Sequence, residues 1–256
     1  MLDARKLALA PTIALLVALG LLAAVAAPAH ANQGPSAPPP AGAKTPEQLV
    51  QDLKSSSASS YIAAVQTLQA LGAGAVPALT AALKDPNADL RGRAAAILAS
   101  IGPAAKDAVP ALSEALADAS GTVRLIVAAA LGEFGPAASA AVPGLVKSMT
   151  DAVPTVRLAS AESLGKIGPA AKSASTVLIA ALGDKDEVLR AKAAKALGMI
   201  GASDAVPALT DLAAKDASPN VKSAAQEALA KLGGSASAAP AAAAPAATPA
   251  AAPHKP

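Results

Sequence analysis

A short phrase returns along the chain at a nearly constant spacing, and this spacing limits the fold more than any other feature. The phrase is Val-Pro-Ala-Leu or a variant of it, and its copies begin at Val76, Val109, Val142, Ser175 and Val206. Such a period is typical of repeat proteins, in which each unit buries its apolar face against its neighbours. A further unit begins at Pro46, so the sequence predicts six units within residues 45–234.

Each unit reads as a short helix, a turn and a longer helix. In the second unit, proline opens a helix over residues 77–84, at a position where its missing N–H costs nothing. After the turn at residues 85–87, apolar residues at helical spacing predict a second helix over residues 88–101. The units close with a glycine suited to a left-handed helix end. These glycines are Gly72, Gly102, Gly135, Gly168, Gly201 and Gly233.

An acidic and a basic residue, six positions apart, recur in every unit after the first. The pairs are Asp85 with Arg91, Asp118 with Arg124, Asp151 with Arg157, Asp184 with Arg190, and Asp216 with Lys222. Small residues follow each pair, as in Ala94-Ala95 and Ala193-Ala194, and Ala225-Gln226 holds this place in the last unit. Small side chains let neighbouring helices approach closely. In the first unit Lys54 and Ser60 hold the acidic and basic positions, as expected of a capping repeat.

This pattern resembles the HEAT repeats of the short bacterial type that is similar to phycobilisome lyases, over residues 45–234. The resemblance implies an all-α fold, a right-handed α-solenoid of about six two-helix repeats. It also implies that the Asp and Arg side chains form a ladder of hydrogen bonds along the stack. One acid and one base per unit would place opposite charges between neighbours and cap the second helix, so we assign these residues a structural role.

The composition argues against most enzyme classes and against nucleic-acid binding. The chain has no cysteine, and His30 and His254 both lie outside the repeats, so no cofactor or metal site is expected. The Asp184, Asp186 and Glu187 cluster lacks the spacing of a calcium loop. The repeats carry equal numbers of acidic and basic residues, without basic runs and almost without aromatic side chains. We therefore expect no nucleic-acid partner.

The two ends of the chain differ from the repeats. Residues 1–31 combine two early cations, an apolar run and a small-residue site ending at Ala31, which predicts a cleaved signal peptide and a secreted or periplasmic protein. The alternative is an uncleaved membrane anchor, because the apolar run approaches the length of a membrane span. Residues 32–44 are a predicted Pro/Gly/Ala linker, and residues 235–256 a predicted disordered Ala/Pro-rich tail. After cleavage no segment is expected to insert into a membrane.

The second helices carry the candidate binding residues. In solenoids these helices usually line the concave face, and one stripe of positions on them varies between units while the rest repeats. Apolar residues near this stripe could form a patch flanked by charges. The candidates are Leu125, Ile126, Glu133, Leu158, Glu162, Lys166, Lys195 and Met199. The alternative is that Leu125 and Leu158 are packed against neighbouring helices.

These features predict an exported protein-binding scaffold without catalytic activity. Its partner would be a protein or peptide held on the concave face. Two alternatives stay open: a subunit that resembles phycobilin lyases, and a structural spacer in the cell envelope.

Overall fold

The computed structural model describes residues 44–233, and these residues form helices and turns without strands. The predicted signal peptide, residues 32–43 of the predicted linker and the predicted tail lie outside the described residues. The chain divides into two compact units, residues 1–141 and 142–256, and each is described by itself.

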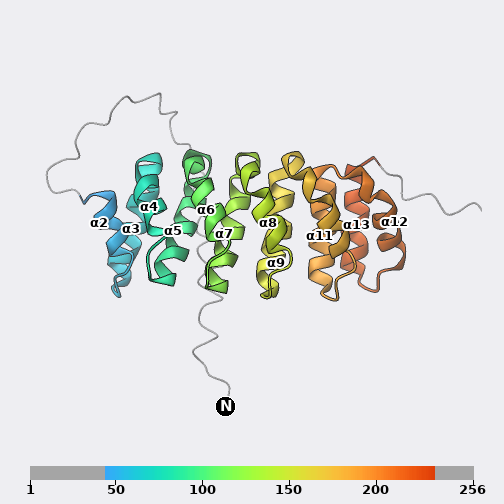
Figure 1. The fold of residues 1–256 in the computed structure, drawn as a ribbon, viewed down its shortest axis with the longest axis horizontal. Coiled ribbons are helices and arrows are strands. Elements are labelled where there is room, and N and C mark those ends of the chain that lie inside the picture. Colours follow the sequence, from blue (N-terminus) through green and yellow to red (C-terminus); the bar gives the residue numbers. More distant parts are fainter. Residues whose placement is uncertain (1–43, 234–256) are drawn as a thin grey trace, which may run out of the picture. The chain divides into compact units, whose positions relative to one another are not determined.

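The described part of the first unit holds three helical pairs (Figure 1). The first helices are α2 (Pro46–Asp52), α4 (Val76–Ala82) and α6 (Val109–Ala115), and the second helices are α3 (Ala58–Leu71), α5 (Ala88–Ile101) and α7 (Gly121–Glu133). Three 3₁₀ segments follow the second helices, namely η1 (Gly72–Ala75), η2 (Gly102–Ala108) and η3 (Gly135–Ala141). Within this unit α5 packs against α3 and α7, and α4 packs against α2.

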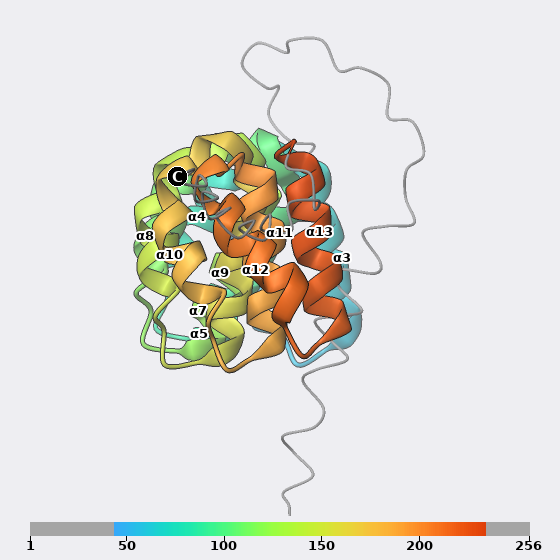
Figure 2. The same cartoon turned by 90° about the vertical axis from the view of Figure 1, so that its right-hand side faces the viewer.

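The described part of the second unit repeats the arrangement. Its first helices are α8 (Val142–Ser148), α10 (Ser175–Ala181) and α12 (Val206–Lys215), and its second helices are α9 (Pro154–Ile167), α11 (Glu187–Ile200) and α13 (Pro219–Lys231). The connecting 3₁₀ segments are η4 (Gly168–Ala174) and η5 (Ser203–Ala205). Helix α11 packs between α9 and α13, and Figure 2 shows α11, α12 and α13 grouped at one end of this unit.

The predicted all-α fold of six helical pairs is confirmed in the described residues. The second helix predicted over residues 88–101 has the same bounds as α5, and the first helix predicted over residues 77–84 is α4, at Val76–Ala82. Pro77 occupies the first turn of α4, where its fixed backbone angle suits helix initiation. The Asn87 side chain accepts from the backbone N–H groups of Asp89 and Leu90, which fixes the start of α5.

The glycines that close the repeats all have positive φ, but three of them, Gly72, Gly102 and Gly168, do not adopt the expected left-handed helical conformation. Gly201 does so, with φ 72° and ψ 38°. Gly102 and Gly168 instead combine positive φ with ψ −140° and ψ −145°, a region open essentially to glycine alone. This conformation turns the chain directly into a 3₁₀ segment. The sequence analysis did not anticipate these segments, because it treated the glycine as a helix end followed by a loop.

The core consists mainly of buried leucines at equivalent positions of successive repeats, with buried alanines packed between them. In five of the six first helices described, one leucine is fully buried at the equivalent position, namely Leu79 and Leu112 in the first unit and Leu145, Leu178 and Leu209 in the second. Alanine pairs on the second helices, such as Ala94-Ala95, are buried as expected. The last repeat departs from this expectation, because Gln226 is exposed and the buried pair is Ala224-Ala225.

Two helical stretches, Ala58–Ala82 and Ala88–Ala115, are long and apolar enough to cross a membrane by length and composition alone. Each one joins the second helix of a repeat to the first helix of the next through a glycine with positive φ, at Gly72 or Gly102. Neither is therefore a single straight helix, and their apolar residues contribute to the core described above.

Candidate functional site

Every ladder aspartate makes the same local turn before its second helix. Its Oδ1 atom accepts a hydrogen bond from the backbone N–H two residues on, at 2.8 or 2.9 Å in all five repeats that carry the aspartate. That N–H belongs to the N-cap residue itself, for example Asn87 before α5 and Ser120 before α7. The aspartate thus orients the residue that starts the helix, whereas the expectation was that it would cap the helix directly.

Each ladder arginine donates a hydrogen bond to the backbone of its own repeat. Its Nη1 atom donates to the main-chain oxygen of the aspartate six residues earlier. These distances are 2.9 Å from Arg91 to Asp85, 2.9 Å from Arg124 to Asp118, 2.8 Å from Arg157 to Asp151 and 2.9 Å from Arg190 to Asp184. The six-residue spacing between aspartate and arginine therefore allows the arginine to donate a hydrogen bond to the main-chain oxygen of that aspartate.

The side-chain carboxylates pair with the preceding repeat. Arg91 Nε and Nη2 donate to the two oxygens of Asp118 at 2.6 and 2.7 Å, and Arg190 holds Asp216 in the same way at 2.7 and 3.0 Å. These two-pronged pairs are largely shielded, with the Arg91 and Asp118 side chains 15% and 8% exposed. Two parallel charge-assisted bonds add geometric specificity to the contact between repeats.

The ion pairs shift the ionisation of the carboxyl groups. The hydrogen bonds from Arg91 lower the pKa of Asp118 below its usual value, with a further contribution from the Ser120 N–H, while burial acts in the opposite direction. The hydrogen bonds from Arg190 lower the pKa of Asp216 in the same way. Both carboxylates therefore stay charged to lower pH than an isolated aspartate does.

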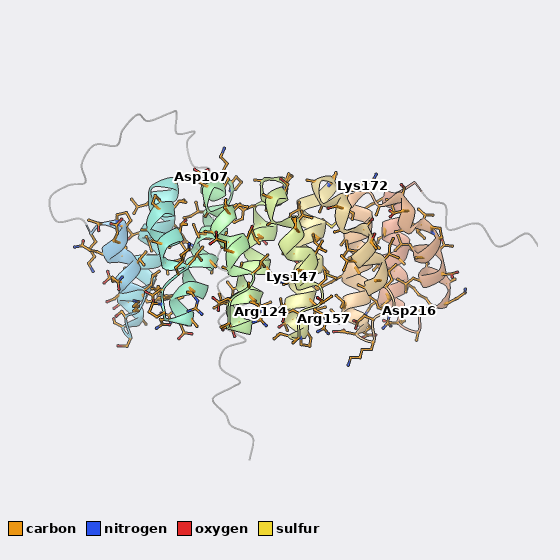
Figure 3. All side chains as sticks on the ribbon, viewed as in Figure 1. Asp107, Arg124, Lys147, Arg157, Lys172 and Asp216 are labelled. Carbon is orange, nitrogen blue, oxygen red and sulfur yellow. The ribbon has the colours of Figure 1, made fainter. Side chains whose placement is uncertain are left out.

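Two repeats depart from this arrangement. Lys54 stands at an acidic position in the sequence pattern, yet its Nζ donates to Asp85 Oδ2 at 2.9 Å and supplies the cation of the first contact. Arg157 keeps its bond to the Asp151 main-chain oxygen, but no carboxylate lies within ion-pair distance of it in the part of the chain that the structure describes. Figure 3 shows Arg157 and Asp216 at the same edge of the second unit. The repeat pattern of the sequence does not distinguish Arg157 from Arg190.

The candidate binding residues of the first unit lie on α7. Leu125 and Ile126 are half-buried there, and Glu133 is exposed at the end of the helix. Ile126 packs onto α5, because a Cβ atom added at Gly92 would lie only 3.0 Å from Ile126 Cδ1. Ile126 therefore contributes to helix packing within the unit. Leu125 keeps part of its side chain in contact with solvent.

The candidates of the second unit come from α9 and α11. Glu162 lies 3.1 Å from Lys166 on its own helix and 2.5 Å from Lys192 on α11. Lys195 lies 3.5 Å from Glu227 on α13, and Leu158 is half-buried. Met199 is 40% exposed, and its Sδ would lie 3.2 Å from a Cβ atom added at Gly165. The structure thus joins Glu162 with Lys166, and Met199 with the backbone of α9.

Sequence analysis missed Lys192 as a member of this surface. Its contact with Glu162 is the principal cause of the lowered pKa of that carboxyl, followed by the contact with Lys166. The equivalent positions in the three earlier repeats are Arg93, Ile126 and Ala159, so a cation there is not a constant feature of the repeat. In the described residues no group of three or more His, Cys, Asp or Glu side chains is arranged to hold a metal ion.

The comparison with known families supports the repeat assignment directly. The family described as HEAT repeats matches residues 46–129, 109–177 and 175–251, which together cover more than half of the chain. The chain belongs to the HEAT repeat family. A search of curated proteins gave no match.

Solved structures similar to this HEAT repeat protein share its fold. An engineered protein is 23% identical with a TM-score of 0.57, over 73% of this chain and 96% of the other. Computationally designed armadillo repeat proteins for modular peptide recognition give 22% and 0.55, over 72% and 98%. The complex of CpcE and CpcF of phycocyanin lyase from Nostoc sp. PCC7120 gives 24% and 0.49, over 60% and 97%. The first two of these likenesses establish the armadillo/HEAT fold alone.

Proposed function

We propose that this HEAT repeat protein is an exported, non-catalytic scaffold that binds a protein or peptide on the face formed by its second helices. The observation that carries the proposal is the contrast between the two sides of these helices. Positions facing the core repeat as leucine and alanine, whereas the equivalent solvent-facing positions of the second unit differ in charge and polarity. These solvent-facing residues are Glu162, Lys195, Glu227, Lys166, Met199 and Lys231.

The fold supports a binding role on physical grounds. Each repeat contributes one second helix, so a row of helices offers several independently variable side chains on a rigid frame. Rigid frames reduce the ordering cost of binding. The likeness to designed armadillo proteins, whose stated purpose is modular peptide recognition, supports a peptide or protein as the kind of partner.

The proposed compartment is outside the cytoplasm, and cell fractionation tests it. The native protein, tagged at its C-terminus, is followed through fractionation, and its first residue is determined by N-terminal sequencing. Recovery in an exported fraction beginning at Asn32 is the expected result. Recovery from the cytoplasm with Met1 retained would contradict the export proposal. Recovery in the membrane with Met1 retained would show that the N-terminal segment is an uncleaved membrane anchor.

Cross-linking followed by mass spectrometry on the same fraction tests the binding role. We expect a protein partner cross-linked to lysines of the second helices, and we expect its capture to fail with the Leu125→Asp, Leu158→Asp double variant. Val146→Asp is the matched control, because Val146 is half-buried like the two leucines but lies on a first helix. If every captured partner remains bound to the folded double variant, the role of these leucines in binding is wrong.

A further inference from the structure

The described part of the second unit contains two junctions between successive repeats, and only one of them carries the ladder ion pair. At the junction between the last two repeats, Arg190 Nε and Nη2 hold the two oxygens of Asp216 at 2.7 and 3.0 Å. We call it the paired junction. At the preceding junction the equivalent residues are Arg157 and Asp184, but no carboxylate of the described residues lies within ion-pair distance of Arg157. We call this one the open junction.

Both residues of the open junction keep the local hydrogen bonds that orient the ladder side chains elsewhere. Arg157 Nη1 donates to the Asp151 main-chain oxygen at 2.8 Å, the bond that every ladder arginine makes. Asp184 Oδ1 accepts from the Asp186 N–H at 2.8 Å, in the turn that every ladder aspartate makes. The two side chains are thus anchored as they are at a paired junction. We therefore attribute the gap to the separation of the two repeats at this edge.

The other end of the open junction is closed. Glu162 Oε2 and Lys192 Nζ lie 2.5 Å apart in the middle of α9 and α11. In the last turn of α9, a Cβ atom added at Gly165 would lie only 3.1 Å from Ala196 Cα on α11. The ladder residues lie at the opposite, N-terminal ends of the two helices. A rotation about the Gly165 contact can therefore open or close the ladder end without separating the helices.

Closing the ladder end is compatible with the glycine contact. At the paired junction the equivalent Gly198 on α11 meets Ala228 on α13, and the ladder ion pair is present as well. Arg157 and Asp184 are half-buried, so water reaches both side chains. An ion pair that stays partly in contact with water shifts an equilibrium by only about two- to fivefold. We therefore expect both arrangements of the open junction to be populated.

We propose that Arg157 and Asp184 form a latch, which is open in this structure and closes when the fifth repeat rotates about the Gly165 contact. In the closed state Arg157 Nε and Nη2 hold the Asp184 carboxylate, as at the paired junction. The latch sets the spacing between the N-terminal halves of α9 and α11, where Leu158 follows Arg157 on α9. A partner that bridges these two helices would shift the equilibrium toward one state. This inference goes beyond the proposed scaffold function and does not depend on it.

Spin labels at equivalent positions test the latch on the purified protein. The chain has no cysteine, so introduced cysteines are labelled specifically. Thr155, Val188 and Asn220 are the second residues of α9, α11 and α13, and all three are exposed. The Thr155→Cys, Val188→Cys double variant reports the open junction, and the Val188→Cys, Asn220→Cys double variant reports the paired junction. Dipolar electron paramagnetic resonance measures the distance between the two labels in each variant.

We expect one narrow distance distribution at the paired junction and two populations at the open junction. Asp184→Asn removes the charge but keeps an oxygen for the Asp186 N–H, and it should lower the ratio of the shorter to the longer population by about two- to fivefold. Glu187→Gln is the matched control, because it makes the same change in charge at an exposed neighbouring residue, and it should leave the ratio unchanged. Far-UV circular dichroism confirms that each variant is folded.

A single population at the open junction would overturn the proposal, and so would the same two populations at both junctions. Two populations that Asp184→Asn leaves unchanged, or that Glu187→Gln changes equally, would show that the movement is not controlled by the latch. The outcome is separate from the cross-linking experiment. A captured partner together with a single population leaves the scaffold function standing and rules out the latch, whereas two populations that respond to Asp184→Asn support the latch even if no partner is captured.

Discussion

At the scale of single residues, glycines allow neighbouring second helices of the second unit to approach closely. A Cβ atom added at Gly198 on α11 would lie 2.7 Å from Ala228 Cα and 3.0 Å from Ala228 Cβ on α13. At Gly165 on α9, the corresponding distance to Ala196 Cα on α11 is 3.1 Å. The contact atoms are backbone and short side chains that cannot rotate away. These glycines therefore set the distance between helices.

Gly198→Ala is expected to destabilise the protein by about 1–3 kcal/mol, because the added methyl group must push α11 and α13 apart. Urea unfolding followed by circular dichroism measures the change. Gly183→Ala is the control, since its Cβ would meet only Ala180 O at 3.7 Å, an ordinary contact. An equal effect of the two substitutions would show that loss of glycine flexibility, and not helix spacing, is responsible.

Asp118→Ala is expected to cost about 2–3 kcal/mol of unfolding free energy. The change leaves the shielded Arg91 guanidinium without its carboxylate and the Ser120 N–H without its acceptor. Glu114→Ala is the comparison, because Glu114 meets Lys84 at 3.4 Å with its side chain 70% exposed. Surface pairs of that kind contribute less than about 1 kcal/mol. If urea unfolding shows comparable losses of unfolding free energy for both variants, the ladder pair is not more stabilising than a surface ion pair, and this account is wrong.

At the scale of elements, the sequence predicted helices better than it predicted their connections. The period of Leu90, Ala94 and Leu98 identifies α5 because burial on one face imposes the helical spacing. The 3₁₀ segments escaped prediction, since Gly102-Pro103 signals a turn without specifying its backbone angles. The ladder residues were found by repetition. Contacts between repeats, such as Lys54 with Asp85 or Ile126 on Gly92, depend on helix spacing and have no local signal.

Gly102→Ala tests the glycine connection between α5 and η2. Gly102 has φ 67° and ψ −140°, and nothing lies within 4 Å of an added Cβ, so the cost is backbone strain without a clash. We expect a loss of about 1–3 kcal/mol in urea unfolding. Gly74→Ala provides the control, because it has negative φ and equally open surroundings. It is expected to be neutral or stabilising by up to about 1 kcal/mol.

At the scale of the whole molecule, the ladder makes stability depend on acidity. The pKa values of Asp118 and Asp216 are lowered by folding, so their stabilising contribution is complete above the unfolded carboxyl pKa and is lost as pH falls through the folded value. We expect the free energy of unfolding to fall as pH drops from about 5 to 2. Asp118→Asn, which keeps a side-chain oxygen but no charge, should flatten that dependence in urea unfolding. An unchanged pH profile would contradict this account.

A destabilising substitution is expected to affect mainly the repeats next to it along the chain. In repeat proteins, each repeat is stabilised mainly by contacts with its immediate neighbours. Hydrogen exchange on Gly198→Ala should therefore show the greatest loss of protection in α11 and α13, and little change in α4 and α5. Uniform loss over all described helices would mean that the chain unfolds as one cooperative body.

The ladder has a direction, because the cations described above as pairing between repeats all reach forward to the aspartate of the following repeat: Lys54 to Asp85, Arg91 to Asp118 and Arg190 to Asp216. A fragment cut before such a repeat would thus begin with an aspartate lacking its cation, and one cut after it would end with an arginine lacking its carboxylate. Two such cut ends carry complementary charges. In the described residues Lys222 has no following repeat, and its charge acts back on Asp216 of its own repeat. Among the described residues, the series of forward-reaching cations therefore ends before the last repeat.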